Sequence, residues 1–155
     1  MSISDIIIVM KDGEIQQIGQ PQEVYDSPCN LFVAKFLGNP PINTFAGSVK
    51  DGRLFIGDCA VSEVRDIPDE DVTVGVRPEG FLPSPQGAFV CSLDRVEVMG
   101  RDISVICTHP ACDDPVIRAI VNGESQVEPG SGTVRFDLKP SKVFVFRKDT
   151  GERIC

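Results

Sequence analysis

The sequence contains no tryptophan, and only one tyrosine and one histidine occur among its 155 residues. Basic residues are also few, since 15 Lys and Arg stand against 23 Asp and Glu and give a net charge of −8. Proteins that bind single-stranded nucleic acid combine a basic groove with aromatic stacking surfaces. We therefore expect no nucleic-acid partner, and the same charge argues against direct attraction to anionic lipid.

Long apolar runs are absent as well. A helix that crosses a bilayer needs about 20 consecutive apolar residues, whereas the run near the start extends only from Ile6 to Met10. The first residues also lack the basic start and the cleavage site of a secretory signal. The cysteines are therefore predicted to be reduced thiols of a cytosolic protein; they are Cys29, Cys59, Cys91, Cys107, Cys112 and Cys155.

The first part of the chain carries the pattern of a hairpin followed by two short helices. Asp12-Gly13 separates Ile6–Met10 from Ile15–Ile18, and Asp-Gly favours a two-residue hairpin turn because both positions tolerate positive φ. The β-branched first strand predicts burial on both faces. Pro21 begins a short predicted helix, and a second one over 29–37 ends at Gly38. Asn39-Pro40-Pro41 is predicted to be an extended linker, which divides the chain into domains at 1–41 and 42–155.

The second part alternates apolar and polar residues with a period of two, which is typical of short strands. Val96 and Val98 continue the alternation of Phe89, Cys91 and Leu93 in the opposite phase, so we expect a β-bulge at Asp94-Arg95. Strands at regular spacing with turn residues between them indicate a barrel or a sandwich. The predicted strands are 45–49, 53–56, 59–64, 72–76, 89–98, 103–107, 116–121, 134–138 and 142–146, with Val134, Phe136, Phe144 and Phe146 expected in the core.

Three segments carry a family resemblance. The first runs from Asp5 to Pro21 and on to Asn43, the second is Gly75-Val76-Arg77-Pro78-Glu79, and the third is the tail from Phe146 to Ile154 with Thr150-Gly151-Glu152-Arg153-Ile154. Together, in this order, they resemble the ATP-binding subunits of carbohydrate-importing ABC transporters, the maltose-type ATPase family. Arg147 departs from the family tail, which usually has an aspartate there.

The resemblance implies a mainly β fold, in which an OB-fold-like β-barrel regulatory domain of the transport-associated type follows the hairpin and helices. It implies a second copy of the same subunit as one partner. The transmembrane permease subunits, reached through the parent ATPase, are the other. The expected location is cytoplasmic, peripheral to the inner face of the cell membrane. Sugars are the substrates that the resemblance favours.

The motifs that bind and hydrolyse ATP are not found in this sequence. A P-loop needs the run G-x-x-x-x-G-K-[ST] to cradle phosphates, and no such run occurs. The ABC signature, the acidic strand with the catalytic glutamate and the switch histidine are also missing. In the family they precede the position that corresponds to Met1. We therefore expect a truncated chain or a split reading frame that binds no cofactor itself, whereas the parent subunit would bind ATP and magnesium.

Particular residues permit other interpretations. Cys107, His109 and Cys112 could bind zinc or form a catalytic Cys–His pair, but their spacing is not that of a standard zinc knuckle and a polar loop is favoured. Arg77 and Glu79 could bind an anion, or they could form a structural ion pair; local pairing at a strand end is favoured. An acidic loop is favoured over weak calcium binding for Asp66, Asp69, Glu70 and Asp71.

Three functions remain open from these observations. The first is a regulatory and dimerisation module, which predicts a dimer or an exposed apolar hairpin face. The second is a sensor that binds a small anion or a sugar through the barrel near Arg77. The third, an independent enzyme, would require a catalytic group around Cys107 and His109.

Overall fold

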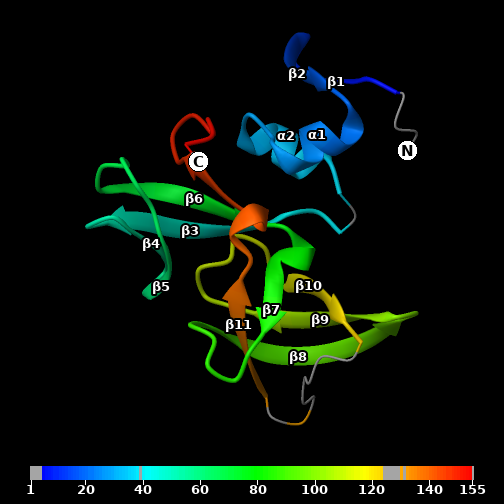
Figure 1. Ribbon diagram of the computed structural model, residues 1–155, viewed down its shortest axis with the longest axis vertical. Helices are drawn as coiled ribbons and strands as arrows, with labels where there is room; N and C mark the ends of the chain where they lie inside the picture. The colour runs from blue at the N-terminus through cyan, green and yellow to red at the C-terminus, as the bar shows by residue number, and fades with distance from the viewer. Residues whose placement is uncertain (1–4, 39, 124–129, 131, 155) are drawn as a thin grey trace.

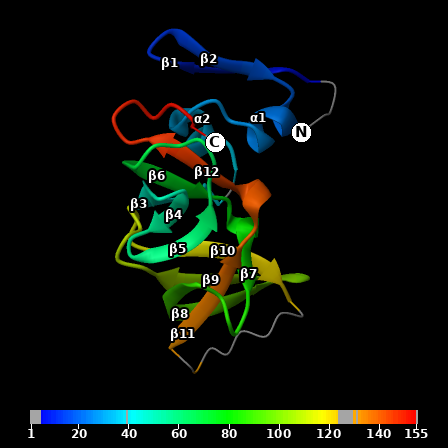
Figure 2. The same ribbon diagram turned by 60° about the vertical axis from the view of Figure 1, so that its left-hand side comes forward.

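The computed structural model describes residues 5–38, 40–123, 130 and 132–154. In these residues the chain is mainly β and is built in layers, which Figure 2 shows from top to bottom. A hairpin lies on two short helices, the helices lie on a first sheet, and that sheet packs on a second one. None of the described helices is long and apolar enough to cross a membrane.

The hairpin is formed by β1 (Ile7–Lys11) and β2 (Glu14–Gly19), as predicted. Its turn residues Asp12 and Gly13 both have positive φ, at 52° and 81°, which is the geometry that Asp-Gly favours. Val9 on its inner face is fully buried against Val24 and Val33 of the helices. Ile8 on the outer face is 55% exposed, so the predicted burial of the first strand on both faces is wrong for this chain.

The helices α1 (Pro21–Asp26) and α2 (Leu31–Phe36) confirm the prediction of two short helices. Pro21 occupies the first turn of α1. An N–H at this position has no acceptor within the helix, so the lack of one in proline costs no helical hydrogen bond. The Asn30 side chain caps α2 by accepting a hydrogen bond of 2.9 Å from the Val33 N–H. Gly38 follows α2 with a φ of 104°, as its predicted role in ending the helix requires. Asn39, in the predicted linker, lies outside the described residues.

The barrel consists of two five-stranded sheets with the orders β12-β6-β3-β4-β5 and β10-β9-β8-β11-β7 (Figures 1 and 2). The neighbouring strands pair antiparallel, and the two sheets bury one shared apolar core between them. The result confirms the prediction of a mainly β, barrel-like fold. The first sheet contains β3 (Asn43–Lys50), β4 (Arg53–Ile56), β5 (Cys59–Glu63), β6 (Glu70–Val76) and β12 (Val143–Arg147). The second contains β7 (Phe81–Pro83), β8 (Phe89–Met99), β9 (Asp102–Thr108), β10 (Ile117–Asn122) and β11 (Thr133–Leu138).

The predicted bulge lies in β8, where the pairing with β9 shifts register between Leu93 and Arg95. The shift turns the end of the β8–β9 hairpin away from the core, so Val98 is 81% exposed. Strand β7 was not predicted, because it has three residues and one of them is Pro83.

The four predicted core residues are buried, but they belong to two cores. Val134 and Phe136 lie between the sheets, whereas Phe144 and Phe146 lie on the outer face of the first sheet and pack with Ala34 and Ile42. Strand β12 is therefore buried on both faces, and its outer face carries the helical layer.

Candidate functional site: the joint between the helices and the barrel

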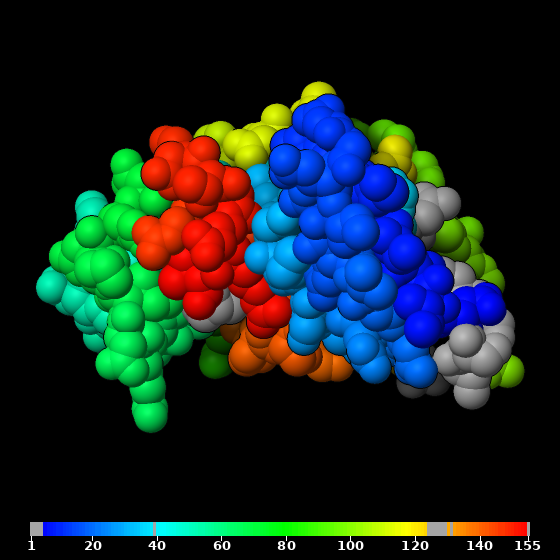
Figure 3. Space-filling model, turned by 90° about the horizontal axis from the view of Figure 1, so that it is seen from above, coloured from blue at the N-terminus to red at the C-terminus, as the bar shows by residue number. Residues whose placement is uncertain are grey.

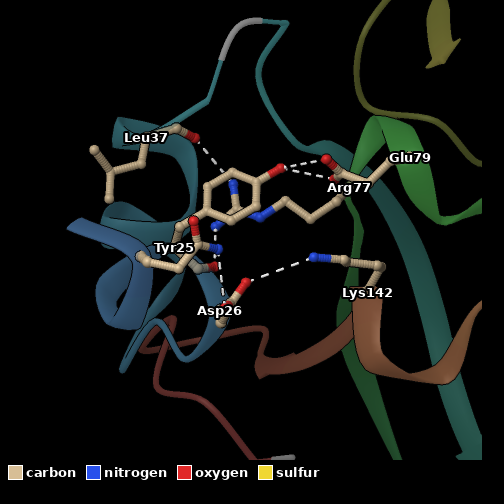
Figure 4. Close-up of polar contacts among 7 residues, drawn as sticks. Tyr25, Asp26, Leu37, Arg77, Glu79 and Lys142 are labelled. Carbon is tan, nitrogen blue, oxygen red and sulfur yellow. Dashed lines mark hydrogen bonds and ion pairs between the residues drawn. The ribbon is translucent and has the colours of Figure 1, made fainter. Parts of the chain in front are cut away.

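The three segments that carry the family resemblance meet at one place in the structure. Arg77, at the end of β6, extends its side chain into the layer of helices and is fully buried (Figure 4). One terminal nitrogen, Nη1, donates hydrogen bonds to the main-chain carbonyls of Ala34 at 2.7 Å and Leu37 at 2.9 Å. The other, Nη2, donates to the carbonyl of Tyr25 at 2.9 Å.

These carbonyls are at the carboxy-terminal ends of α1 and α2, where the last carbonyls of a helix have no N–H donor within the helix. A cation is favoured there because the last carbonyls carry partial negative charge. An arginine suits the position because its planar fork can reach two helix ends at once. Its guanidinium carbon also lies 4.1 Å from the centre of the Tyr25 ring, so Arg77 joins both helices to the barrel.

Side chains around Arg77 add two further links between the same layers. The Tyr25 hydroxyl lies 2.7 Å and 2.8 Å from the two carboxylate oxygens of Glu79 and donates a hydrogen bond to that carboxylate. Glu79 belongs to η1 (Pro78–Gly80), the short 3-10 turn after β6. Asp26 lies 3.5 Å from the Lys142 ammonium of η3 (Pro140–Lys142). Both links therefore connect the end of α1 to turns of the barrel.

The environment shifts the ionisation of both central groups. Burial lowers the pKa of Arg77, which still remains a cation because its usual value is so high. Burial, and then the hydrogen bond to the negatively charged Glu79, raise the pKa of Tyr25 well above its usual value. Removing the Tyr25 proton would place a second negative charge beside Glu79.

We predict that Tyr25 does not ionise until the fold is lost. Because Tyr25 is the only tyrosine and the chain has no tryptophan, the tyrosinate absorbance in the near ultraviolet reports on this group alone. In denaturant it should titrate at about pH 10; in the folded chain the absorbance should stay flat at that pH. A raised folded-state pKa stabilises the fold below about pH 10 and the benefit is lost as the pH rises through the folded value.

The matched variant is Glu79→Gln, which should lower the folded-state pKa of Tyr25 because the neighbouring negative charge is gone. Titration of folded wild-type Tyr25 at the same pH as in denaturant would show that the hydroxyl is not held by Glu79.

The tail forms a second connection between barrel and helices. The Leu31 N–H donates to the Gly151 carbonyl at 2.8 Å, and the Arg153 N–H donates to the Cys29 carbonyl at 3.2 Å. Figure 3 shows the tail in red beside the hairpin and helices in blue. Arg147, which departs from the family pattern, lies 3.7 Å from Glu70 and 3.9 Å from Glu152, so its charge is paired within the barrel and tail.

The two candidate site residues therefore lie side by side but bond to different partners. Arg77 bonds to helix carbonyls that are 40 or more residues earlier in the chain, not to a local acid. Glu79 bonds to Tyr25. The sequence analysis did not identify Tyr25 as a candidate site residue. The available signal was that Tyr25 is the chain's only tyrosine and lies in the first segment of the resemblance. Ligand binding by Arg77 or Glu79 stays a prediction.

The other candidate residues are not assembled into a site in the described part of the chain. His109 stacks on Phe89, with ring centres 4.7 Å apart, and its Nδ1 accepts a hydrogen bond from the Ala111 N–H. Burial lowers the pKa of His109. Cys107 is buried in the barrel core. Among the described residues no group of three or more His, Cys, Asp or Glu is placed to hold a metal ion, and this covers both the Cys–His loop and the acidic loop near Asp69.

We call the contacts of Arg77, Tyr25–Glu79, Asp26–Lys142 and the tail the joint. The joint binds parts of the chain to one another with buried and charge-assisted hydrogen bonds. Such an arrangement can fix the orientation of the hairpin and helices on the barrel. The contacts described for it are all between parts of the chain, as in a rigid mechanical connection.

Comparison with known proteins identifies the family. No protein-family model matches the chain. It is 32% identical over 167 residues to the sn-glycerol-3-phosphate import ATP-binding protein of Roseobacter denitrificans, covering 99% of this chain and 44% of that protein. It is 34% identical over 181 residues to the diacetylchitobiose uptake system ATP-binding protein of Streptomyces coelicolor, covering 99% and 47%. The chain thus spans less than half the length of these relatives. It belongs to the family of ABC-importer ATP-binding subunits, in which it corresponds to the carboxy-terminal part.

Proposed function

We propose that the chain is the regulatory and dimerisation part of the ATP-binding subunit of an ABC importer. The observation that supports its place within a larger ATP-binding subunit is the outer face of the hairpin. The inner face of the hairpin is packed, whereas its outer face is apolar and open to solvent. We call this face the outer patch; it consists of Ile6, Ile8, Met10, Ile15 and Ile18, each more than half exposed. An apolar patch of this kind on one side of a folded chain marks an interaction surface.

The pairing of the two strands concentrates the patch. Ile8 lies opposite Ile18 and Met10 lies opposite Ile15, so these four side chains form two cross-strand pairs on one face. A two-stranded ribbon is marginally stable without cover on its faces. The relatives are more than twice as long as the matched region. We propose that the remaining part of an ATP-binding subunit covers the outer patch.

The other parts of the proposal rest on the family resemblance and on the relatives' names. The complete subunit would bind ATP and magnesium, whereas this chain would hold neither and would not hydrolyse ATP. Its partners would be a second copy of the subunit and, through the ATPase, the transmembrane permease subunits at the inner face of the membrane. A sugar or a related solute is the proposed substrate, because the relatives are named for sn-glycerol-3-phosphate and diacetylchitobiose.

The joint supports a regulatory role. It fastens the helices to the barrel at Arg77, at Tyr25–Glu79 and at the tail. A change in the barrel would therefore be transmitted to the hairpin as a rigid movement. The proposed direction of communication is from the barrel, through α1 and α2, to the surface that contacts the ATPase.

Light scattering over a series of concentrations tests the pairing. We expect a mass of twice the 16.8 kDa of the chain. The control is Ile8→Lys/Ile18→Lys, which removes the apolar character of the outer patch. If the barrels pair, this variant should remain a dimer; if it becomes a monomer, the dimer was an artefact of the uncovered hairpin. A wild-type monomer at the highest concentration would contradict self-pairing.

A second candidate function, a small-ligand sensor, is favoured by a pocket at the open edge of the barrel. This pocket does not involve Arg77, whose Nη1 and Nη2 are already bonded to helix carbonyls.

A further inference from the structure

A pocket of about 490 Å³ lies where the first sheet fails to close. Strands β5 and β12 are the two edges of this sheet. Both contribute to the lining, and a third wall is formed by Leu138 at the end of β11 together with Pro140 and Ser141 of η3. This volume is within the range of small-molecule sites, about 300 to 1,000 Å³.

The floor of the pocket is apolar. It includes Leu54 from β4, Val61 from β5, and Val143 and Phe144 from β12. Leu54 and Phe144 are almost completely buried, so the floor is continuous with the two cores. A hydrocarbon body placed here would be removed from water at a gain of about 25 cal/mol per Å².

The charged residues on the rim of the pocket, Asp26, Glu63 and Arg153, differ in whether an opposite charge faces them. Asp26 is paired with Lys142 at 3.5 Å. Glu63 lies directly across the strand pair from Arg53 in the β4–β5 register, so an opposite charge faces it. Arg153 is different. Its guanidinium lies 5.0 Å from the centre of the Phe144 ring, and its side-chain hydrogen bond in the described structure is a long one, 3.4 Å to the Pro28 carbonyl.

Two other arginines have more partners than Arg153, although the buried Nε of Arg77 has no hydrogen-bond acceptor. Arg77 makes three short hydrogen bonds to carbonyls, and Arg147 lies near two carboxylates. Arg153, half-buried beside an apolar floor, is the cation among the described lining residues, and its guanidinium makes only that long hydrogen bond. A guanidinium fork matches the geometry of a carboxylate.

From this geometry we infer that the pocket binds an apolar monocarboxylate. Its hydrocarbon body lies on Leu54, Val61 and Val143, and its carboxylate accepts hydrogen bonds from Arg153. The ligand contacts both edges of the sheet and the tail, so it closes the barrel at its open side. This inference stands on the pocket alone and does not depend on the proposed pairing.

The test is an NMR titration of the whole chain with octanoate, with octan-1-ol as the neutral probe of the same length. We expect octanoate to shift the signals of Val61 and Val143, with a Kd of about 1 mM or tighter. Octanol should bind at least about tenfold more weakly, because it lacks the charge that Arg153 recognises. Equal binding of the two probes would overturn the inference.

Variants separate the pocket from the outer patch of the hairpin, the other surface that attracts apolar probes. Arg153→Gln should weaken octanoate binding by about tenfold or more, and Arg95→Gln, at an exposed arginine in the β8 bulge, should leave it unchanged. Ser141→Trp starts from an exposed position and should block the pocket without removing Arg153. Ile8→Lys/Ile18→Lys should have no effect. Shifts at Ile8 and Ile18, or undiminished binding to Arg153→Gln and Ser141→Trp, would show that octanoate binds elsewhere.

Discussion

Arg77→Met should destabilise the chain by about 3 to 5 kcal/mol. The substitution keeps an unbranched side chain of similar length but removes three hydrogen bonds to the carbonyls of Tyr25, Ala34 and Leu37. These carbonyls lie at the ends of two six-residue helices that have few bonds of their own. Leaving buried acceptors without donors costs about 1 to 3 kcal/mol each. Urea unfolding of the whole chain measures the loss.

Two variants make the result specific to the joint. Arg77→Lys should recover only part of the stability, because an ammonium cannot bridge two helix ends as a planar fork does. Arg95→Met removes an arginine that is half exposed and pairs with Asp94 and Glu97, and it should change stability by less than about 1 kcal/mol.

Hydrogen exchange locates the effect in the chain. In Arg77→Met the amides of 24–37 should exchange faster while those of the β3–β6 pair remain protected. A stability equal to that of wild type, or uniform loss of protection, would mean that Arg77 does not hold the helices on the barrel.

The local elements of this fold could be predicted from the sequence because short-range chemistry decides them. Asp12-Gly13 specified the hairpin turn, and both residues have the positive φ that the turn requires. The change of phase between Leu93 and Val96 predicted the bulge that the β8–β9 register shows. In each case the signal and the structure lie within a few residues of one another.

The order of the strands and the joint could not be predicted in this way. Strand β3 lies between β6 and β4, and β11 lies between β8 and β7. Such neighbours are selected by packing across the shared core, which leaves no local pattern. Arg77 was expected to pair locally, but it bonds to carbonyls 40 to 52 residues earlier. Every residue has a main-chain carbonyl of the same chemistry, so the residue types do not indicate which carbonyls accept hydrogen bonds from Arg77.

The pattern of β12 illustrates the same limit. Val143 and Val145 pack toward the barrel core, while Phe144 and Phe146 pack toward the helices. The sequence predicted that the phenylalanines are buried, and they are. It did not show that they face away from the barrel core, since a strand that is apolar at every position gives no inward face.

Substitution of the outer patch should abolish docking while leaving the chain itself folded. Ile8 and Ile18 face each other across the hairpin and are 55% and 56% exposed. In the isolated chain, Ile8→Lys/Ile18→Lys should therefore change the free energy of unfolding by less than about 1 kcal/mol. It should also reduce the binding of the fluorescent probe ANS, which reports exposed apolar surface.

The same substitutions should have a large effect once the rest of an ATP-binding subunit is present. The assay is a chimera in which this chain replaces the matching part of the Streptomyces coelicolor relative. Covering the two isoleucines completely would bury apolar side chains worth about 1.5 to 3 kcal/mol each, and two lysines would instead be forced out of water. We expect the unsubstituted chimera to unfold in one cooperative transition and the double-lysine chimera to unfold in two.

The control places a lysine at an exposed position far from the hairpin, on the opposite side of the barrel. Val98→Lys lies near the tip of the β8–β9 hairpin, where the side chain is 81% exposed, and it adds one lysine without touching the outer patch. It should leave the chimera with a single transition. If the double-lysine chimera also unfolds in one transition, the outer patch does not contact the ATPase part, and the hairpin would be a solvent-facing layer that shields Val9, Val24 and Val33.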